Sequence, residues 1–254
     1  MAQGPLRSGR GKIYVAQLDL TYTPGPLRYV GYSKEGVMIK FGIEEQKVKE
    51  SDTGLDSIVS QMTTGYDPAF DFAMQEWTRK NLALALWSDS AVVAAGTVTD
   101  EEQATGLVAD DVIKTVRPKI SSVVITDDAG SPATLVAGTD YEVTDAQNGI
   151  ITLLDVTGFT QPFHVAYAYA ESYQVPFGTT PDREHRIVFA GLNKANQLNG
   201  FGFELYRVKF KPTEELIMKS FEFNDLKLTG TLLPDPSKPN DPLLGRHGKS
   251  WGSE

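Results

Sequence analysis

The sequence predicts a mainly β protein with one short α-helix and a small β-rich insertion. Apolar and polar residues alternate over residues 36–48 and 67–77, which is typical of half-buried strands. Residues 79–87 carry apolar side chains at helical spacing instead. Acidic residues are concentrated at 89–177, and such a break in composition indicates an insertion in a more neutral scaffold.

The strands of the scaffold can be placed in order along the chain. In 36–48 and 67–77 one face is apolar and the other is mostly polar, so both belong to a sheet with one solvated face. The apolar residues of the second segment are Phe70, Phe72 and Met74. Further scaffold strands are expected at 12–20, 28–31, 187–191, 201–210, 216–218 and 221–230.

The pattern changes from strand to helix at Thr78. A threonine hydroxyl suits the N-cap position, so we expect a helix over 79–87. Because nearly every residue in the second half of this segment is apolar, the sheet should cover most of the helix. The residues expected to cap the helix and to form its core are Thr78, Leu82, Leu86 and Trp87.

Residues 49–65 keep neither a helical nor a strand period, so the sequence predicts a long loop there. The loop carries four apolar side chains, Leu55, Ile58, Val59 and Met62. Long loops in compact domains are commonly functional, and a free loop has little reason to expose apolar groups. The loop therefore either contacts a partner or folds back over its own core.

The charge distribution sets the insertion apart. The chain has 33 acidic and 24 basic residues, and residues 89–177 hold 13 of the acids but only 3 of the bases. No basic face strong enough for specific nucleic-acid binding is visible. Short strands with tight turns are expected in the insertion at 122–126, 137–143, 149–154 and 163–170.

The two ends of the chain are expected to be arms that become ordered only on a partner. Trp251 either anchors such a contact or belongs to a disordered tail. With no apolar run of membrane-spanning length and no signal peptide, we expect no membrane association and synthesis in a cytoplasm. We therefore expect an N-terminal arm at 1–11, a scaffold at 12–88 and 178–233 interrupted by the acidic insertion at 89–177, and a C-terminal arm at 234–254.

No catalytic or metal-binding motif stands out. The chain has no cysteine, and its three histidines, His164, His185 and His247, show no metal-ligand spacing and are expected in a strand, a loop and a tail. Neighbouring acids such as Glu44 and Glu45 would point to opposite faces of a strand, which disfavours a catalytic pair. We expect no enzymatic activity, no cofactor and no metal.

The order of the segments resembles the major tail tube proteins of long-tailed, siphovirus-type bacteriophages. The resemblance rests on GKIYVAQLD, on the stretch from RYVGYSKEGVMIKFGIEEQ to NLALALW, and on IVFAGLNKANQLNGFGFELYRVKF with the residues that follow it. It covers roughly the first and last thirds of the chain. It consists of a diffuse pattern of strand, long loop, strand, helix and closing sheet, without an invariant motif.

The resemblance implies a β-sandwich-like subunit with a flanking helix. Six subunits would form a ring whose inner strands, 36–48, 67–77, 187–192 and 201–210, join into one β-barrel, and rings would stack through Leu55, Ile58, Val59 and Met62. Lumen-facing residues would be Lys40, Glu44, Asp71, Gln75, Arg207 and Lys209, although an ordinary solvated sheet face explains them equally well.

The resemblance also implies a function and partners. The tube would belong to the virion tail, be assembled in the host cytoplasm around a tape-measure protein, and end on tail terminator and tail-tip proteins. It would conduct DNA without binding a particular sequence. Acidic lumen residues would repel phosphate and prevent sticking, whereas lysines would retard the DNA.

Two other classes of function remain open. A carbohydrate- or cell-surface-binding β-module would use Tyr141, Tyr167 and Tyr169 of the insertion as an exposed aromatic platform. A hydrolase of unrecognised type would require paired acids that converge in a pocket.

Overall fold

A computed structural model describes residues 9–34, 36–50, 57–193, 199–220, 222–238 and 245–252, with Asn199 described by its backbone only. The chain divides into unit 1, Met1–Ser90 with Val175–Glu254, and unit 2, Ala91–Gln174. The expected insertion, 89–177, lies within three residues of unit 2 at either end. Within the described ranges the strands named below all pair antiparallel, so the mainly β fold is confirmed.

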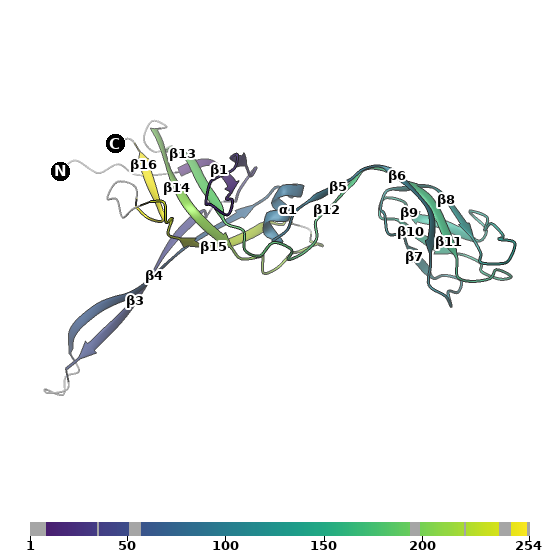
Figure 1. The fold of residues 1–254 in the computed structure, drawn as a ribbon, viewed down its shortest axis with the longest axis horizontal. Helices are drawn as coiled ribbons and strands as arrows, with labels where there is room; N and C mark the ends of the chain where they lie inside the picture. The colour runs from purple at the N-terminus through teal and green to yellow at the C-terminus, as the bar shows by residue number, and fades with distance from the viewer. Residues whose placement is uncertain are drawn as a thin grey trace. The chain divides into compact units, whose positions relative to one another are not determined.

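Unit 1 is built on one large sheet, in which the strand order is β2-β1-β13-β14-β15-β4-β3 (Figure 1). β14 pairs with β13 along one edge, while β16 and β15 follow one another along its other edge. The strands are β1 Gly9–Gln17, β2 Arg28–Tyr29, β3 Met38–Lys49, β4 Ile58–Met74, β13 His185–Asn193, β14 Asn199–Phe210, β15 Leu226–Leu233 and β16 Gly248–Gly252.

The core of unit 1 lies on one face of this sheet. Phe70, Phe72 and Met74 are buried, as their alternation predicts, and the ring of Phe70 lies 5.3 Å from that of Phe72 and 6.5 Å from that of Phe210. Aromatic side chains bury large apolar areas, so this group contributes strongly to stability. Other strands add Ile13, Val15, Ile187, Val208, Leu226 and Leu228.

The helix α1, Arg79–Ala85, begins where the sequence predicts and ends earlier. The Oγ1 atom of Thr78 accepts a hydrogen bond from the backbone N–H of Asn81 at 3.2 Å, so Thr78 is the N-cap. Leu86 is the C-cap, and the predicted core residues Leu82, Leu86 and Trp87 are only half-buried. The buried residues of α1 are Asn81, Ala83, Leu84 and Ala85.

Asn81 ties α1 to the sheet. Its side-chain amide donates hydrogen bonds to the carbonyl oxygens of Val30, at 2.7 Å, and Glu76, at 2.9 Å. Its Oδ1 atom accepts a hydrogen bond from Arg28 at 2.6 Å. A buried polar side chain is stabilising only when such partners are present, which explains an asparagine at a 1% exposed position.

Three of the expected strand and loop assignments in unit 1 were wrong. Residues 58–65 belong to β4; because this part of the strand is exposed on both faces, its sequence shows no alternation. The predicted strand 216–218 is absent, and the strand expected from residue 221 begins at Leu226.

The arm expected at 234–254 contains β16, and the arm expected at 1–11 ends in the first residues of β1. Gly202 makes the β16 pairing possible, since a Cβ atom there would lie 2.6 Å from the ring of its cross-strand partner Trp251.

Unit 2 has two three-stranded sheets that share one apolar core. One sheet contributes the buried residues Ile125 and Val165, and Phe163 lies directly before one of its strands. The other sheet contributes Ile151 and Leu153. The four predicted strands are present. One sheet consists of β6 Gly96–Glu102, β11 His164–Tyr169 and β8 Ile120–Thr126, the other of β7 Val112–Lys114, β10 Ile150–Leu153 and β9 Tyr141–Asp145, and β5 Ala91–Val93 pairs with β12 Ser172–Gln174.

Replacing Asn81 should destabilise unit 1 specifically. In Asn81→Ala the carbonyl of Val30 and the guanidinium of Arg28 each lose a partner, so we expect the free energy of unfolding to fall by about 3 kcal/mol. Tryptophan fluorescence during urea unfolding reports on unit 1, because Trp77, Trp87 and Trp251 all belong to it. The control is Asn224→Ala, a half-buried asparagine whose side-chain amide donates to the carbonyl of Ile217, and it should cost less than about 1 kcal/mol. Equal losses would contradict this role of Asn81.

Candidate functional site

The most unusual feature of unit 1 is a two-stranded ribbon, residues 41–49 of β3 and 58–68 of β4, which extends from the sheet (Figure 1). β4 pairs with β15 only over residues 69–74, so the ribbon part of β4 pairs with β3 alone. β3 is also the last strand in the sheet order, and its second edge has no partner among the described strands. A free edge of this length is a template for pairing with another chain.

The ribbon exposes many apolar side chains. Phe41 is 66% exposed and Val59 is 65% exposed. The other exposed apolar residues of the ribbon are Ile43, Val48, Ile58, Met62 and Tyr66. Isolated apolar side chains are common on protein surfaces, but a group along one thin element indicates a surface that is covered in an assembly.

Part of this apolar surface continues the core of unit 1. Ile39 pairs with Phe70, and two residues further out Phe41 pairs with Pro68, so these side chains lie on the same face of the sheet. The next pair is Ile43 and Tyr66. The rings of Phe41 and Tyr66 are stacked at 6.4 Å. The core-facing side of the sheet therefore extends into the ribbon. There Phe41, Ile43 and Tyr66 stay largely exposed, although the ring of His247 lies 5.3 Å from that of Tyr66.

The predicted lumen-facing residues lie mostly on the opposite face, which we call the charged face. The register aligns Lys40 with Ala69, Ala69 with Thr231, and Thr231 with Lys209. Asp71, Arg207 and Glu44 lie an even number of residues from members of this row, so they occupy the same face. Gln75 follows the last residue of β4 and is not part of the sheet.

The cations of the charged face are neutralised locally. Lys40 forms an ion pair with Asp71 at 2.5 Å, and Lys209 forms one with Asp182 at 2.8 Å. The guanidinium of Arg207 contacts both carboxylate oxygens of Glu184, at 2.7 and 2.8 Å. This hydrogen bonding raises the pKa of Arg207. The face presents paired charges rather than an attractive basic track for phosphate.

The residues expected to join neighbouring rings are on the ribbon. Ile58, Val59 and Met62 are 53%, 65% and 60% exposed on β4. Val48 pairs with Ser60, two residues from Met62, so the side chains of Val48 and Met62 lie on one face. Leu55 lies outside the described residues. The alternative, a loop that folds back over its own core, is wrong from residue 58, where the chain is an exposed strand.

The structure contradicts the aromatic platform expected for a carbohydrate-binding module. Tyr141 and Tyr167 are each 3% exposed, and Tyr169 is half-buried. The hydroxyl of Tyr141 donates to the carbonyl of Val123 at 2.9 Å. Tyr167 donates to Glu101, and burial with this hydrogen bond raises the pKa of Tyr167 to about 12. These tyrosines are core residues of unit 2.

A cavity of about 340 Å³ lies in unit 1, between β1, α1 and the start of β13. Asp89 is the one carboxylate among its lining residues, so it lacks the paired acids that a hydrolase of the expected kind would need. No group of three potential metal ligands occurs within the ranges that the structure describes. The cavity holds Arg28, Arg183 and His185, none of which the sequence pattern singled out.

His185 was expected in a loop and is instead the buried first residue of β13. A signal was present: His185, Ile187 and Phe189 follow the two-residue period of the core face. Its Nδ1 atom has no hydrogen-bond partner among the described residues. Burial, together with the charges of Arg28 and Arg183, lowers the pKa of His185 to about 4.

The buried imidazole predicts that unit 1 loses stability in mild acid. The unfolded chain binds a proton at His185 below its ordinary pKa of 6.5, whereas the folded chain binds it only near 4, so stability is full above 6.5 and is lost as the pH falls toward 4. From pH 7 to 4.5 this site should lower the free energy of unfolding by roughly 2 to 3 kcal/mol. Urea unfolding followed by tryptophan fluorescence measures the loss. His185→Gln should remove that part of the pH dependence, and an unchanged pH dependence would refute the assignment.

No helix in the described part of the chain is long and apolar enough to cross a membrane. A comparison with curated proteins gives no significant match. The model of one family, described as "Protein of unknown function UCP028589", matches residues 6–250. Since this match runs from before β1 into β16, the chain belongs to the family of proteins of unknown function UCP028589.

Proposed function

We propose that the protein is a structural virion protein that assembles into stacked hexameric rings and so forms the tail tube of a long-tailed bacteriophage. The observation that carries this proposal is the ribbon of β3 and β4, which combines a free strand edge with exposed apolar side chains. Both features are unfavourable in an isolated molecule and become favourable when copies of the chain cover them.

The sheet has suitable edges for a ring. The free edge of β3 is 12 residues long, or roughly 40 Å at about 3.3 Å per residue. At the other end of the sheet, β2 covers only Tyr14 and Val15 of β1. If one edge of each copy binds the other edge of the next copy, the copies form a chain. The chain closes into a ring when the rotation between neighbouring copies is a whole fraction of a full turn. In the proposed ring the sheets of six copies form one barrel around an axial channel.

The charged face would then line this channel. Lys40, Arg207 and Lys209 are each paired with a carboxylate there, which reduces their capacity to hold phosphate groups. Such a surface favours passage of DNA over binding. The proposed partners are further copies of the chain, a tape-measure protein inside the channel during assembly, and the tail terminator and tail-tip proteins at the two ends. The tube would be built in the host cytoplasm and act without catalysis or a cofactor.

Negative-stain electron microscopy of the concentrated protein tests the proposal most directly. Rings or tubes with an axial hole are expected, either spontaneously or with a tail-tip initiator. A protein that stays monomeric under both conditions would argue strongly against a tube.

Two aspartate substitutions on the ribbon should separate ring closure from stacking. Ile43→Asp, close to the sheet, should leave the protein monomeric, because it places a charge where the neighbouring copy would cover an apolar face. Met62→Asp should allow rings but shorten or abolish tubes. Analytical ultracentrifugation and microscopy distinguish monomers, single rings and stacked tubes.

A matched control is Val136→Asp in unit 2, where the valine is 58% exposed, close to the 59% of Ile43 and 60% of Met62. This variant should assemble like the wild type. Tryptophan fluorescence should show unit 1 folded in every variant; unfolding by Met62→Asp would mean that the ribbon is part of the core. Assembly unaffected by both ribbon substitutions would disprove their role.

A further inference from the structure

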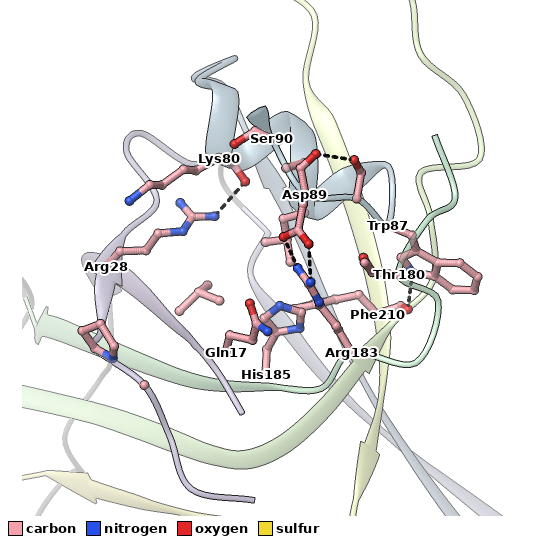
Figure 2. A pocket seen from close by; sticks show the side chains of 16 residues that line it. Gln17, Arg28, Lys80, Trp87, Asp89, Ser90, Thr180, Arg183, His185 and Phe210 are labelled. Atoms are coloured by element: carbon pink, nitrogen blue, oxygen red, sulfur yellow. Dashed lines mark hydrogen bonds and ion pairs between the residues drawn. The ribbon is translucent and has the colours of Figure 1, made fainter. Parts of the chain in front are cut away.

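The cavity of unit 1 brings cationic groups together beside an apolar wall. Figure 2 shows the guanidinium of Arg28 on one side of the cavity and Asp89, Arg183 and His185 on the other. With the exposed Lys80 also in the lining, the cavity has three cationic residues and one carboxylate, so the lining is positively charged at neutral pH. This is opposite in sign to the net charge of −9 of the whole chain.

Arg28 carries the argument, because its charge has no counterion in the described part of the chain. Its two terminal nitrogens donate to neutral oxygens only, Oδ1 of Asn81 at 2.6 Å and the backbone oxygen of Lys80 at 3.1 Å. Burial lowers the pKa of Arg28, and no nearby carboxylate opposes this effect. A partly buried, unpaired charge is costly, and an anion in the cavity would offset that cost.

The opposite side of the cavity is already ordered for a ligand. Asp89 holds Arg183 through both carboxylate oxygens, which fixes the guanidinium in place. His185 lies next to them and is only 9% exposed. Its Nδ1 atom has no hydrogen-bond partner within the described structure. Asn81 in turn fixes Arg28. The polar groups are therefore preorganised, which reduces the entropy lost on binding.

The remaining wall is apolar. Val15, Pro26, Leu84, Trp87 and Phe210 are among the residues that line the cavity. The volume, about 340 Å³, falls in the range of small-molecule sites, which run from about 300 to 1,000 Å³. Apolar walls with a few convergent polar groups are typical of such sites.

We propose that this cavity binds a small organic oxyanion, a carboxylate or a phosphate ester, whose charged group pairs with Arg28 and whose apolar body lies against Val15 and Leu84. The site belongs to unit 1 alone and does not depend on assembly, so it is separate from the function proposed above.

Isothermal titration calorimetry of the full chain tests the site with two probes, phenyl phosphate and benzoate, against sodium chloride at matched ionic strength. Saturable binding of either probe supports the proposal, and the preferred probe identifies the phosphate or the carboxylate class. Arg28→Gln should weaken binding at least tenfold, which corresponds to about 1.4 kcal/mol. The control Arg10→Gln changes an exposed arginine of β1 outside the cavity and should leave the affinity unchanged.

Absence of saturable binding to the wild type, or equal affinity for Arg28→Gln, overturns the proposal. If Arg28→Gln does not fold, methyl NMR of the wild-type protein tests the site instead. In methyl NMR spectra, probe-dependent shifts at Val15 and Leu84 support the site, whereas shifts confined to residues outside the cavity overturn it. All these measurements use unassembled protein, so they remain interpretable even if no tube forms.

Discussion

The pairing of β4 with β15 is the interaction on which unit 1 depends. It aligns Met74 with Leu226 and Phe72 with Leu228, and so joins segments from opposite ends of the chain. Without it, β3 and β4 would be an isolated hairpin, which is marginal in water. The same strand has two environments: residues 69–74 complete the core, whereas β3 is the only described strand that pairs with residues 58–68. The stability of the core half fixes the position of the exposed half.

The polar groups of unit 1 are organised in two contrasting ways. On the charged face, Lys40, Arg207 and Lys209 each pair with a carboxylate, which reduces the free charge of the surface. In the cavity, Arg28 has only neutral acceptors and His185 has an unpartnered nitrogen. The three cations named on the charged face have carboxylate partners, whereas Arg28 in the cavity donates only to neutral oxygens.

The features that follow from local periodicity could be predicted from the sequence. Alternation identified Phe70, Phe72 and Met74, the N-cap followed from Thr78, and the register places five of the six proposed lumen residues on one face. The ribbon part of β4 could not be recognised, because a strand exposed on both sides has no reason to alternate. Short polar strands such as β6, with the sequence GTVTDEE, lack the same signal.

Tertiary contacts explain the other differences. Leu82 and Leu86 are apolar but half-buried, because the sheet contacts the side of α1 that carries Ala83 and Leu84. β16 was missed because its pairing depends on Gly202, a residue distant in the sequence that leaves room for Trp251. The cavity was missed for a related reason: Arg28, Asp89 and His185 come together only when β2, the end of the α1 region and β13 assemble.

The paired strands β5 and β12 are the only segments of unit 2 adjacent in sequence to unit 1, and they lie side by side from Ser172 and Val93 to Gln174 and Ala91. The chain thus leaves the scaffold and returns to it at neighbouring points. A gene segment coding for such a module can be gained, lost or exchanged by recombination without changing the fold of the scaffold. The acidic unit 2 can therefore diversify independently of the large sheet of unit 1.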